Sequence, residues 1–506
     1  MSKIELNEDH ARIKKFIETG EPIELHKGKL AFLILQWCAV IAIGTVLLIG
    51  LLTPEKIQIL FLIFLISGLL TFNVHFWVIL TLFIVMASTV AFLAALAVNN
   101  LLRKHGSGLI KFSIIFITIV FWILLLSFSI IMYIYTLSTY VFWVLIFPLI
   151  FTIAMVISFT KGKQALRRAG IILKLTGQIV HEERELIVPA ILKIFLIGIL
   201  TFFLGIIDLY IMTWIYPMIS EPVLVWVLGI IIFFIESFYI IFNINMFTAI
   251  SYAISYIWYR NKDPVLRDGF AVALYQMGDI AIFSILSAII EIIKAILRSL
   301  SKRKGTSQSW IPDGFRLAEG IIGSVWYYIN YFTLPSIVIE DKPVTKAIKS
   351  SAHRLYDNFA DVFMKEYGVK LSFSLLTVLM LIIFGSGGGL FGLILYYAYV
   401  YPIMGILDYI IMIVLVVVGI ILFIAISMII IRPMLMMYND IYMAILFGFL
   451  IDKENDFKYP VRLPENILND WKEWFNKHPS ITRCPNCNTP VESGVPKCPK
   501  CGYTLP

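Results

Sequence analysis

Charged residues are scarce in this chain of 506 residues, since Asp, Glu, Lys and Arg together make up 15% of it. Soluble globular domains carry about a quarter. Hydrophobic residues reach 60%, and the mean hydropathy is +0.89. Apolar runs of about 18 to 30 residues recur between Leu30 and Ile431, whereas short alternating strands of the outer-membrane type are missing. Lipid cannot satisfy backbone N–H and C=O groups, so these runs are predicted to be membrane-spanning α-helices.

Catalytic signatures are missing as well. The seven histidines are scattered through polar segments, and no H-E-x-x-H, G-x-S-x-G or paired-carboxylate pattern occurs. We therefore expect a protein without enzymatic activity. Only five cysteines are present, and one of them, Cys38, lies in an apolar run where a small buried side chain is its expected role. No disulfide framework is indicated.

The basic residues do not form one dense block. The formal net charge is +8, and the Lys and Arg residues lie between the apolar runs and in the C-terminal tail. This distribution is typical of residues that set membrane orientation and contact lipid headgroups, so the lipid bilayer is the first expected partner. It argues against nucleic acid as a partner, which needs a concentrated basic surface. The sequence leaves a homo-oligomer open.

The N-terminal part is predicted to be a membrane bundle. Residues 1–29 form an amphipathic segment expected on the membrane surface, and the first apolar run, 30–52, lacks a small-residue cleavage site and is expected to be retained. The bundle, 30–160, has predicted spans at 30–52, 57–72, 76–100, 112–135 and 139–159, although 57–100 also fits one helical hairpin. An amphipathic linker, 161–183, follows.

The second part is predicted to be a six-helix membrane domain over 184–450. Its spans are expected near 187–217, 223–258, 269–297, 317–339, 371–397 and 403–431, which gives an all-α polytopic membrane protein of about 11 transmembrane helices. The polar segment 341–370 has helical periodicity and is expected along the membrane surface, while the apolar run after Ile431 is expected as an interfacial or packed helix. A soluble linker, 451–483, leads to a predicted zinc ribbon, 484–506.

Charge asymmetry predicts a multi-pass protein of the cell membrane with a cytoplasmic C-terminus. The basic linker 161–183 and the C-terminal tail both fit the cytoplasmic side. The loop 298–316, with Lys302, Arg303 and Lys304, falls outside under strict alternation. Either the charge rule is broken once, or the segment 269–297 does not fully cross the membrane.

Four sequence blocks carry a resemblance to a known family. They are RELIVPAIL (184–192), FNINMFTAISYA (242–253), DPVLRDGFAVAL (263–274) and SVWYYINYFTLPSIVIEDKPVTKAIKSSAHRLYDNF (324–359). Over 184–440 the chain resembles an uncharacterised family of prokaryotic six-helix integral membrane proteins. The last block also resembles the membrane domain sometimes fused to glycerophosphodiester phosphodiesterases. No such catalytic domain accompanies it here, so that activity is not implied.

Four cysteines near the C-terminus are the strongest chemical signal. Cys484 and Cys487 form one C-x-x-C knuckle, and Cys498 and Cys501 form a second one ten residues later, followed by Gly502. Four thiolates at this spacing can surround one tetrahedral Zn²⁺ and leave no position for a catalytic water. The pattern resembles rubredoxin-like zinc ribbons, and a redox or iron role is the alternative. A tail this short depends on its metal for folding free energy.

The ribbon surface is a candidate docking site for a cytosolic protein partner. Arg483, Lys497, Lys500 and Tyr503 are the side chains expected to contact that partner. The alternative is a passive terminal cap. Our first hypothesis is therefore a membrane scaffold or adaptor whose zinc ribbon engages a partner.

Polar residues inside the predicted spans form a second candidate site. They are Asp208, Glu236, Asn243, Asn245, Gln276, Asp279, Glu291, Lys294, Asn330 and Asp408. Such residues are costly in hydrocarbon and are expected to face protein or water. Asp208, Glu236 and Asp279 around a cavity near the membrane midplane would indicate the alternative function, a transporter or channel for a small solute or lipid.

Simpler roles are also open for several of these residues. Glu291 and Lys294 are three residues apart and are expected to pair on one helix face. The two asparagines, Asn243 and Asn245, are expected to hydrogen-bond between helices. The glycines between 385 and 392 are expected to allow tight helix packing rather than to form an ion filter.

Overall fold

The computed structural model describes most of the second part of the chain. The described residues are 12–19, 23–51, scattered positions between 85 and 122, 169–301, 310–357, 359–397, 408–454, 461–462, 481–483, 490–492 and 501. The elements are α1 (Arg12–Thr19), α2 (Lys27–Leu51), η2 (Arg184–Leu186), α6 (Ile187–Tyr210), η3 (Ile211–Ile215), η4 (Tyr216–Met218), α7 (Pro222–Tyr259), α8 (Leu266–Tyr275), α9 (Met277–Ser301), α10 (Trp310–Ile329), α11 (Thr333–Glu340), α12 (Val344–Asp357), α13 (Phe359–Leu395), α14 (Asp408–Glu454), β1 (Ile481–Arg483) and β2 (Pro490–Glu492).

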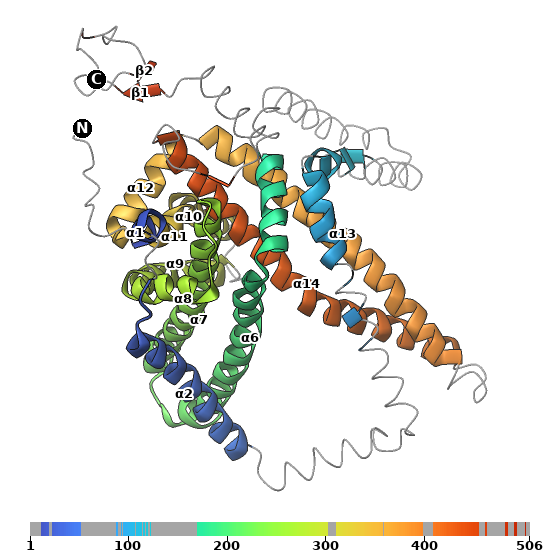
Figure 1. The fold of residues 1–506 in the computed structure, drawn as a ribbon. Coiled ribbons are helices and arrows are strands. Elements are labelled where there is room, and N and C mark those ends of the chain that lie inside the picture. Colours follow the sequence, from blue (N-terminus) through green and yellow to red (C-terminus); the bar gives the residue numbers. More distant parts are fainter. Residues whose placement is uncertain are drawn as a thin grey trace.

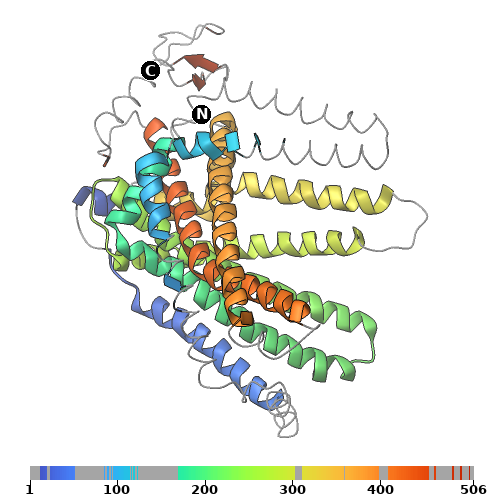
Figure 2. The same ribbon diagram turned by 90° about the vertical axis from the view of Figure 1, so that its right-hand side faces the viewer.

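Three pairs of consecutive helices pack as antiparallel hairpins in the described part of the chain. They are α6 with α7, α9 with α10, and α13 with α14. The two views in Figures 1 and 2 show the hairpins diverging from a common region in which α8, α11 and α12 lie. The N-terminal helix α2 lies against α6. The fold is therefore a set of apolar arms joined at one buried core.

The buried core is made by the C-terminal halves of the two longest helices. Nearly every side chain of α7 from Phe242 to Tyr259 is buried, whereas its first half exposes Val223 and Trp226. The last part of α14, from Met437 to Asp452, is buried in the same way. Helices α8, α11 and α12 close around these segments. Each long helix thus changes from an apolar exposed surface to a packed interior along its length.

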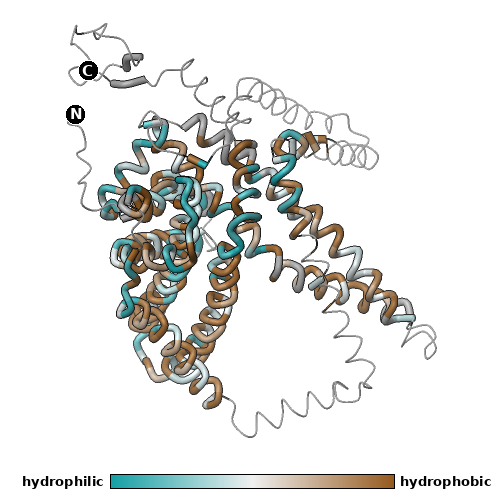
Figure 3. Tube along the Cα trace, viewed as in Figure 1, coloured by the Kyte–Doolittle hydropathy of each residue, from teal (hydrophilic) through white to brown (hydrophobic). Residues whose placement is uncertain are grey.

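Exposed apolar side chains on the arms identify the lipid-facing surface. Figure 3 shows hydrophobic residues dominating α6, α7, α13 and α14 toward the ends away from the core. Within the described residues, six helices are long and apolar enough to span a membrane: Lys27–Gly50, Arg184–Met218, Pro222–Tyr259, Met277–Ser301, Ser372–Ile394 and Ile431–Asp452. The all-α membrane class is confirmed. The predicted spans 57–72 and 139–159 lie outside the described residues, and only scattered positions of 76–100 and 112–135 are described.

One predicted span, 317–339, is broken in the structure. Helix α10 ends at Ile329 and α11 begins at Thr333. Two side chains bind the backbone groups freed at the break. The Asn330 amide donates to the carbonyl of Trp326 (3.0 Å), while the Ser351 hydroxyl accepts from the Phe332 N–H (2.9 Å) and donates to the carbonyl of Ile329 (2.7 Å). The prediction of one continuous helix was wrong because these polar partners replace the helical hydrogen bonds.

Two other predicted boundaries also differ. The segment 269–297 is divided at Gln276 into α8 and α9. The described part of the predicted span 403–431 begins at Asp408 and belongs to a single helix, α14, that continues through Pro433 to Glu454. The expectation of a packed helix after Ile431 is confirmed, and this segment is simply the second half of α14.

Three segments with an amphipathic pattern pack on the protein. Helix α1 contacts α7 and α11, and its Ile13 is buried. Residues 169–182, within the predicted linker, form a helix whose Ile172 and Leu173 are buried. In α12 the apolar face is buried and includes Val344 and Leu355. The amphipathic pattern was interpreted correctly as helix, but its apolar face meets the core rather than only lipid.

Glycines bring α13 and α14 into backbone contact. A Cβ atom added at Gly392 would lie 2.5 Å from the carbonyl oxygen of Leu415, and one added at Gly419 would lie 2.5 Å from that of Gly388. Helices can approach this closely only where side chains are missing. The predicted tight helix packing of this glycine stretch is confirmed.

Candidate functional site

The C-terminal tail begins with a two-stranded antiparallel sheet. Strands β1 and β2 pair Ile481 with Glu492 and Arg483 with Pro490. The first cysteine knuckle, 484–487, therefore belongs to the connection of this hairpin. Cys501 lies in a turn, while Cys484, Cys487 and Cys498 lie outside the described residues. A hairpin that carries one knuckle in its connection, with four thiolates in the chain, fits the donor set of a tetrahedral zinc site.

The structure brings together two of the three carboxylates predicted to line a cavity. Asp208 on α6 and Glu236 on α7 are half-buried and lie near one another on neighbouring helices. Asp279 is not with them. Its Oδ1 accepts a hydrogen bond from the backbone N–H of Val344 (3.1 Å), at the first residue of α12. Asp279 thus satisfies a backbone N–H that the helix itself leaves without a partner.

Four further predicted polar residues have partners within the described part of the chain. Lys294 and Glu291 form an ion pair at 2.6 Å on one face of α9, as expected. Asn243 accepts a hydrogen bond from the indole N–H of Trp37 on α2 (2.6 Å). Asn245 donates to the hydroxyl of Ser284 on α9 (3.0 Å). Both asparagines therefore join neighbouring helices.

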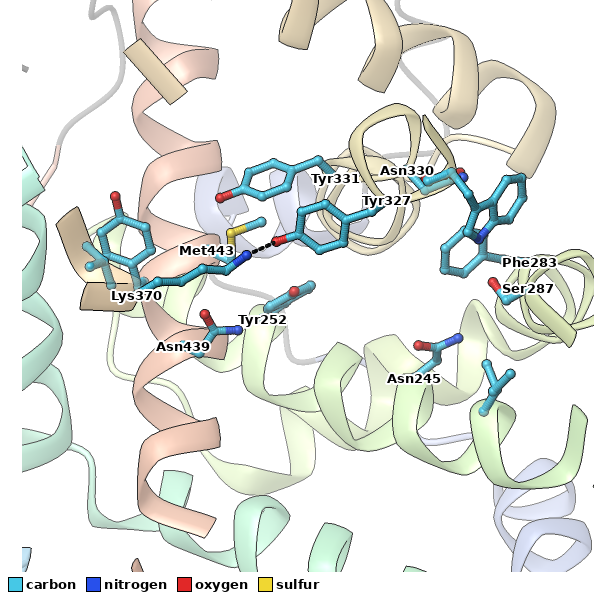
Figure 4. Close-up of a pocket in the computed structure, with 14 residues that line it drawn as sticks. Asn245, Tyr252, Phe283, Ser287, Tyr327, Asn330, Tyr331, Lys370, Asn439 and Met443 are labelled. Atoms are coloured by element: carbon cyan, nitrogen blue, oxygen red, sulfur yellow. Dashed lines mark hydrogen bonds between the residues drawn. The ribbon is translucent and has the colours of Figure 1, made fainter. Parts of the chain in front are cut away.

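A cavity of about 300 Å³ lies elsewhere, between α7, α9, α10, α13 and α14 (Figure 4). Its described lining is rich in aromatic rings and amides and includes Asn245, Tyr327, Lys370 and Asn439. None of Asp208, Glu236 and Asp279 is among those lining residues. The cavity was not predicted, because its residues come from five separate helices and share no sequence pattern.

Two buried ion pairs were missed in the sequence. Lys193 of α6 lies 3.0 Å from Asp440 of α14 and also donates to the hydroxyl of Thr248 (2.6 Å). Arg260, just after α7, lies 2.6 Å from Asp452 at the end of α14. Each pair joins segments about 200 residues or more apart in sequence, as their numbers show. In the sequence, each of these residues is a single charge in or next to an apolar run. Such a charge indicates that the residue needs a partner but does not identify that partner.

A third charged cluster joins α11, α12 and α14. The Arg354 guanidinium donates two hydrogen bonds to Glu340 (both 2.7 Å) and two to Glu454 (2.7 and 2.6 Å). Burial alone would raise the pKa of Glu340, but Arg354 and then Lys342 outweigh it and hold that pKa below its ordinary value. Arg354 is buried although it is charged. The reason is the pair of carboxylates that neutralise it.

Arg462 ties the chain leading to the ribbon onto the end of α7. Its backbone N–H donates to the carbonyl of Tyr259 (2.9 Å), and its guanidinium donates to Asp263 (2.8 Å). The guanidinium also lies over the Trp258 ring, 5.2 Å from its centre, and 3.7 Å from Glu182. We call this set of contacts the Arg462 clamp. Beside it, burial and the charge of Asp263 raise the pKa of Glu183, against the opposing effect of Arg462.

Comparison with known proteins agrees with both parts of this architecture. Residues 223–457 match DUF6159, a family of unknown function. Residues 480–505 match a zinc-ribbon domain. No curated protein matches the chain. The predicted resemblance to an uncharacterised membrane family and the predicted zinc ribbon are confirmed.

The DUF6159 match begins in the first turn of α7 and ends just after α14. It therefore contains the buried core, the Arg354 cluster and every described residue that lines the cavity. Lys193 and Asp208, on α6, lie before it. Arg462 lies between the DUF6159 match and the zinc ribbon, so the clamp acts at the junction of the two matched regions.

Proposed function

We propose that this protein is a membrane scaffold or adaptor that holds a zinc ribbon at the cytoplasmic end of its buried core, where the ribbon engages a protein partner. The observation that carries this proposal is the Arg462 clamp. It fixes the chain 22 residues before Cys484, at the end of α7. A ribbon that starts from a fixed point on the bundle can present its surface to a partner in a defined position.

Zinc binding by the four terminal cysteines is part of the proposal. Cys484, Cys487, Cys498 and Cys501 would hold Zn²⁺, which would supply the folding free energy of the ribbon and no catalysis. The ribbon residues Arg483, Lys497, Lys500 and Tyr503 would then form the docking surface. We propose no enzymatic activity for the chain.

The cytoplasmic assignment follows from charge. Basic residues cluster in segments at the buried core: Arg184 at the start of η2, Arg260 between α7 and α8, Arg267 in the first turn of α8, and Lys346 and Lys349 on α12. The positive-inside rule places such segments on the cytoplasmic side of the cell membrane. Arg462 and the chain leading to the ribbon are attached to that same side.

A transporter or channel is the second candidate. The neighbouring carboxyl groups of Asp208 and Glu236 favour it, because ionisable residues inside membrane helices often mark a transport pathway. Against it, Asp279 is used in capping α12, Glu291 is paired with Lys294, and the cavity of the membrane domain is lined by other residues. Because Asp279 and Glu291 already have partners inside the protein, they favour the scaffold over the transporter.

Metal analysis combined with partner capture tests the proposal. The intact chain, purified from its own membranes, should hold about one zinc per chain together with a protein partner. The C484S/C487S variant should lose both, because two of four thiolates are missing, while its membrane helices stay folded in detergent. C38S is the matched control and should keep both. A wild-type chain with a folded tail and no zinc, or a partner retained by C484S/C487S, would contradict the proposal.

A further inference from the structure

The cavity lies where the lipid-facing arms meet the buried core. On α10, Leu317, Ile321 and Val325 are exposed, and the cavity lining begins at the next residue, Trp326. On α13, Lys370 lies just before the apolar segment Ser372–Ile394. A ring of Trp and Tyr with a Lys at the end of an apolar helix is typical of the depth at which lipid headgroups lie. The cavity therefore opens at headgroup depth.

Its chemistry is that of an anion site with an apolar wall. Lys370 is the one charged side chain among the described lining residues, and its Nζ lies 3.2 Å from the hydroxyl of Tyr327 and 4.7 Å from the centre of that ring. Figure 4 shows the Lys370 amine directed at this hydroxyl, and Asn439 lines the same cavity. The side chains of Lys370, Tyr327 and Asn439 are all exposed. An ammonium group with a hydroxyl and an amide can bind phosphate oxygens together.

The remaining lining suits the rest of a lipid. Phe283, Met443 and Ile241 supply apolar surface, and Asn245 and Ser287 supply polar atoms at the end of the cavity away from Lys370. A volume of about 300 Å³ holds a headgroup with its glycerol but not two acyl chains. The exposed apolar residues of α10, which run from the cavity toward the tip of the α9–α10 hairpin, offer a path for those chains.

We propose that this cavity binds the phosphate headgroup of an acidic membrane phospholipid, with Lys370 as the cationic partner and Tyr327 and Asn439 as hydrogen-bonding partners. This role goes beyond the proposed scaffold function and does not depend on the zinc ribbon. A free phosphate compound would share the same chemistry. The lipid source is favoured because the cavity opens beside the exposed apolar face of α10.

Native mass spectrometry of the purified full-length chain tests this proposal. Phosphatidylglycerol should be retained, whereas phosphatidylcholine should be retained more weakly at the same concentration. K370Q should weaken phosphatidylglycerol retention about tenfold, the usual value of one charge-assisted hydrogen bond. Y327F should weaken it in the same direction. K346Q, an exposed position on α12 outside the cavity, is the matched control and should change nothing.

Three results would overturn the proposal. The first is equal retention of both lipids by the wild-type chain. The second is unchanged phosphatidylglycerol retention in K370Q, a variant of an exposed side chain. The third is displacement of the lipid by glycerol 3-phosphate at an equal concentration, which would assign the cavity to a soluble phosphate compound instead.

Discussion

Replacing Arg354 with methionine should destabilise the protein by roughly 3–5 kcal/mol, which for a chain of this length corresponds to a fall in thermal midpoint of about 3–5 °C. Arg354 and Glu340 are both buried, with side chains 7% and 10% exposed. Removing the guanidinium leaves the Glu340 carboxylate in the core with Lys342, 2.9 Å away, as its remaining ion-pair partner among the described residues. The measurement is thermal unfolding of the detergent-solubilised chain.

Two further variants distinguish the effect of the lost charge of Arg354 from the effect of its lost packing. K349M changes an exposed lysine on the same helix and should leave the midpoint within about 1 °C, since surface changes cost under about 0.5 kcal/mol. R354M/E340Q should recover part of the loss, because no buried carboxylate is then left without its cation. A midpoint for R354M equal to that of K349M would show that the cluster does not hold α11, α12 and α14 together.

The same cluster predicts an acid dependence. The pKa of Glu340 is held below its ordinary value of 4.5 by Arg354 and Lys342, despite burial. Its stabilising contribution is therefore present above that ordinary value and is lost as the pH falls through the lower pKa of the folded state. The difference in midpoint between wild type and R354M should be full at neutral pH and should narrow as the pH falls below 4.5. A difference independent of pH would contradict this account.

Adding a methyl group at Gly388 or Gly392 should force α13 and α14 apart, although the same change one residue away should be tolerated. A Cβ atom at Gly388 would lie 2.8 Å from the Cα of Ile420, and one at Gly392 would lie 2.5 Å from the Cα of Val416. Backbone cannot move aside as a side chain can, so G388A and G392A should each cost about 1–3 kcal/mol. The measurement is again thermal unfolding in detergent.

Gly389 supplies a control in the same helix turn. A Cβ atom there would meet Ile420 Cγ1 at 3.6 Å, an ordinary contact. G389A should leave stability unchanged or raise it by up to about 1 kcal/mol, since alanine favours helix over glycine. The changes in stability of G388A and G389A are therefore expected to have opposite signs. Equal effects of G388A and G389A would mean that the helices are not in backbone contact.

Much of the architecture could be predicted from composition and spacing. The long apolar runs predicted helical membrane segments, because lipid leaves the backbone few alternatives. The spacing of Cys484, Cys487, Cys498 and Cys501 predicted the zinc ribbon, since four thiolates at that separation have few other uses. The periodicity of α12 predicted its buried face, and the glycines near residue 388 predicted close helix packing.

The features that were not predicted from the sequence depend on partners distant in the chain. Nothing near Lys193 indicates that its carboxylate is Asp440, and nothing near Arg354 indicates that Glu340 and Glu454 neutralise it. The break after Ile329 depends on Ser351, a residue of another helix. The expected set of three carboxylates was reduced to a pair for the same reason, because Asp279 caps the first turn of α12.

Site-specific photo-crosslinking in cells tests the scaffold function most directly. A photoreactive amino acid at position 504, next to the proposed docking residue Tyr503, is compared in three forms of the full chain: wild type, K497E/K500E and D208N/E236Q. The account predicts a defined crosslinked protein partner with wild type and D208N/E236Q, and its loss with K497E/K500E. A crosslink that survives the ribbon charge reversal, or one that disappears when only the carboxyl pair is neutralised, would contradict the account.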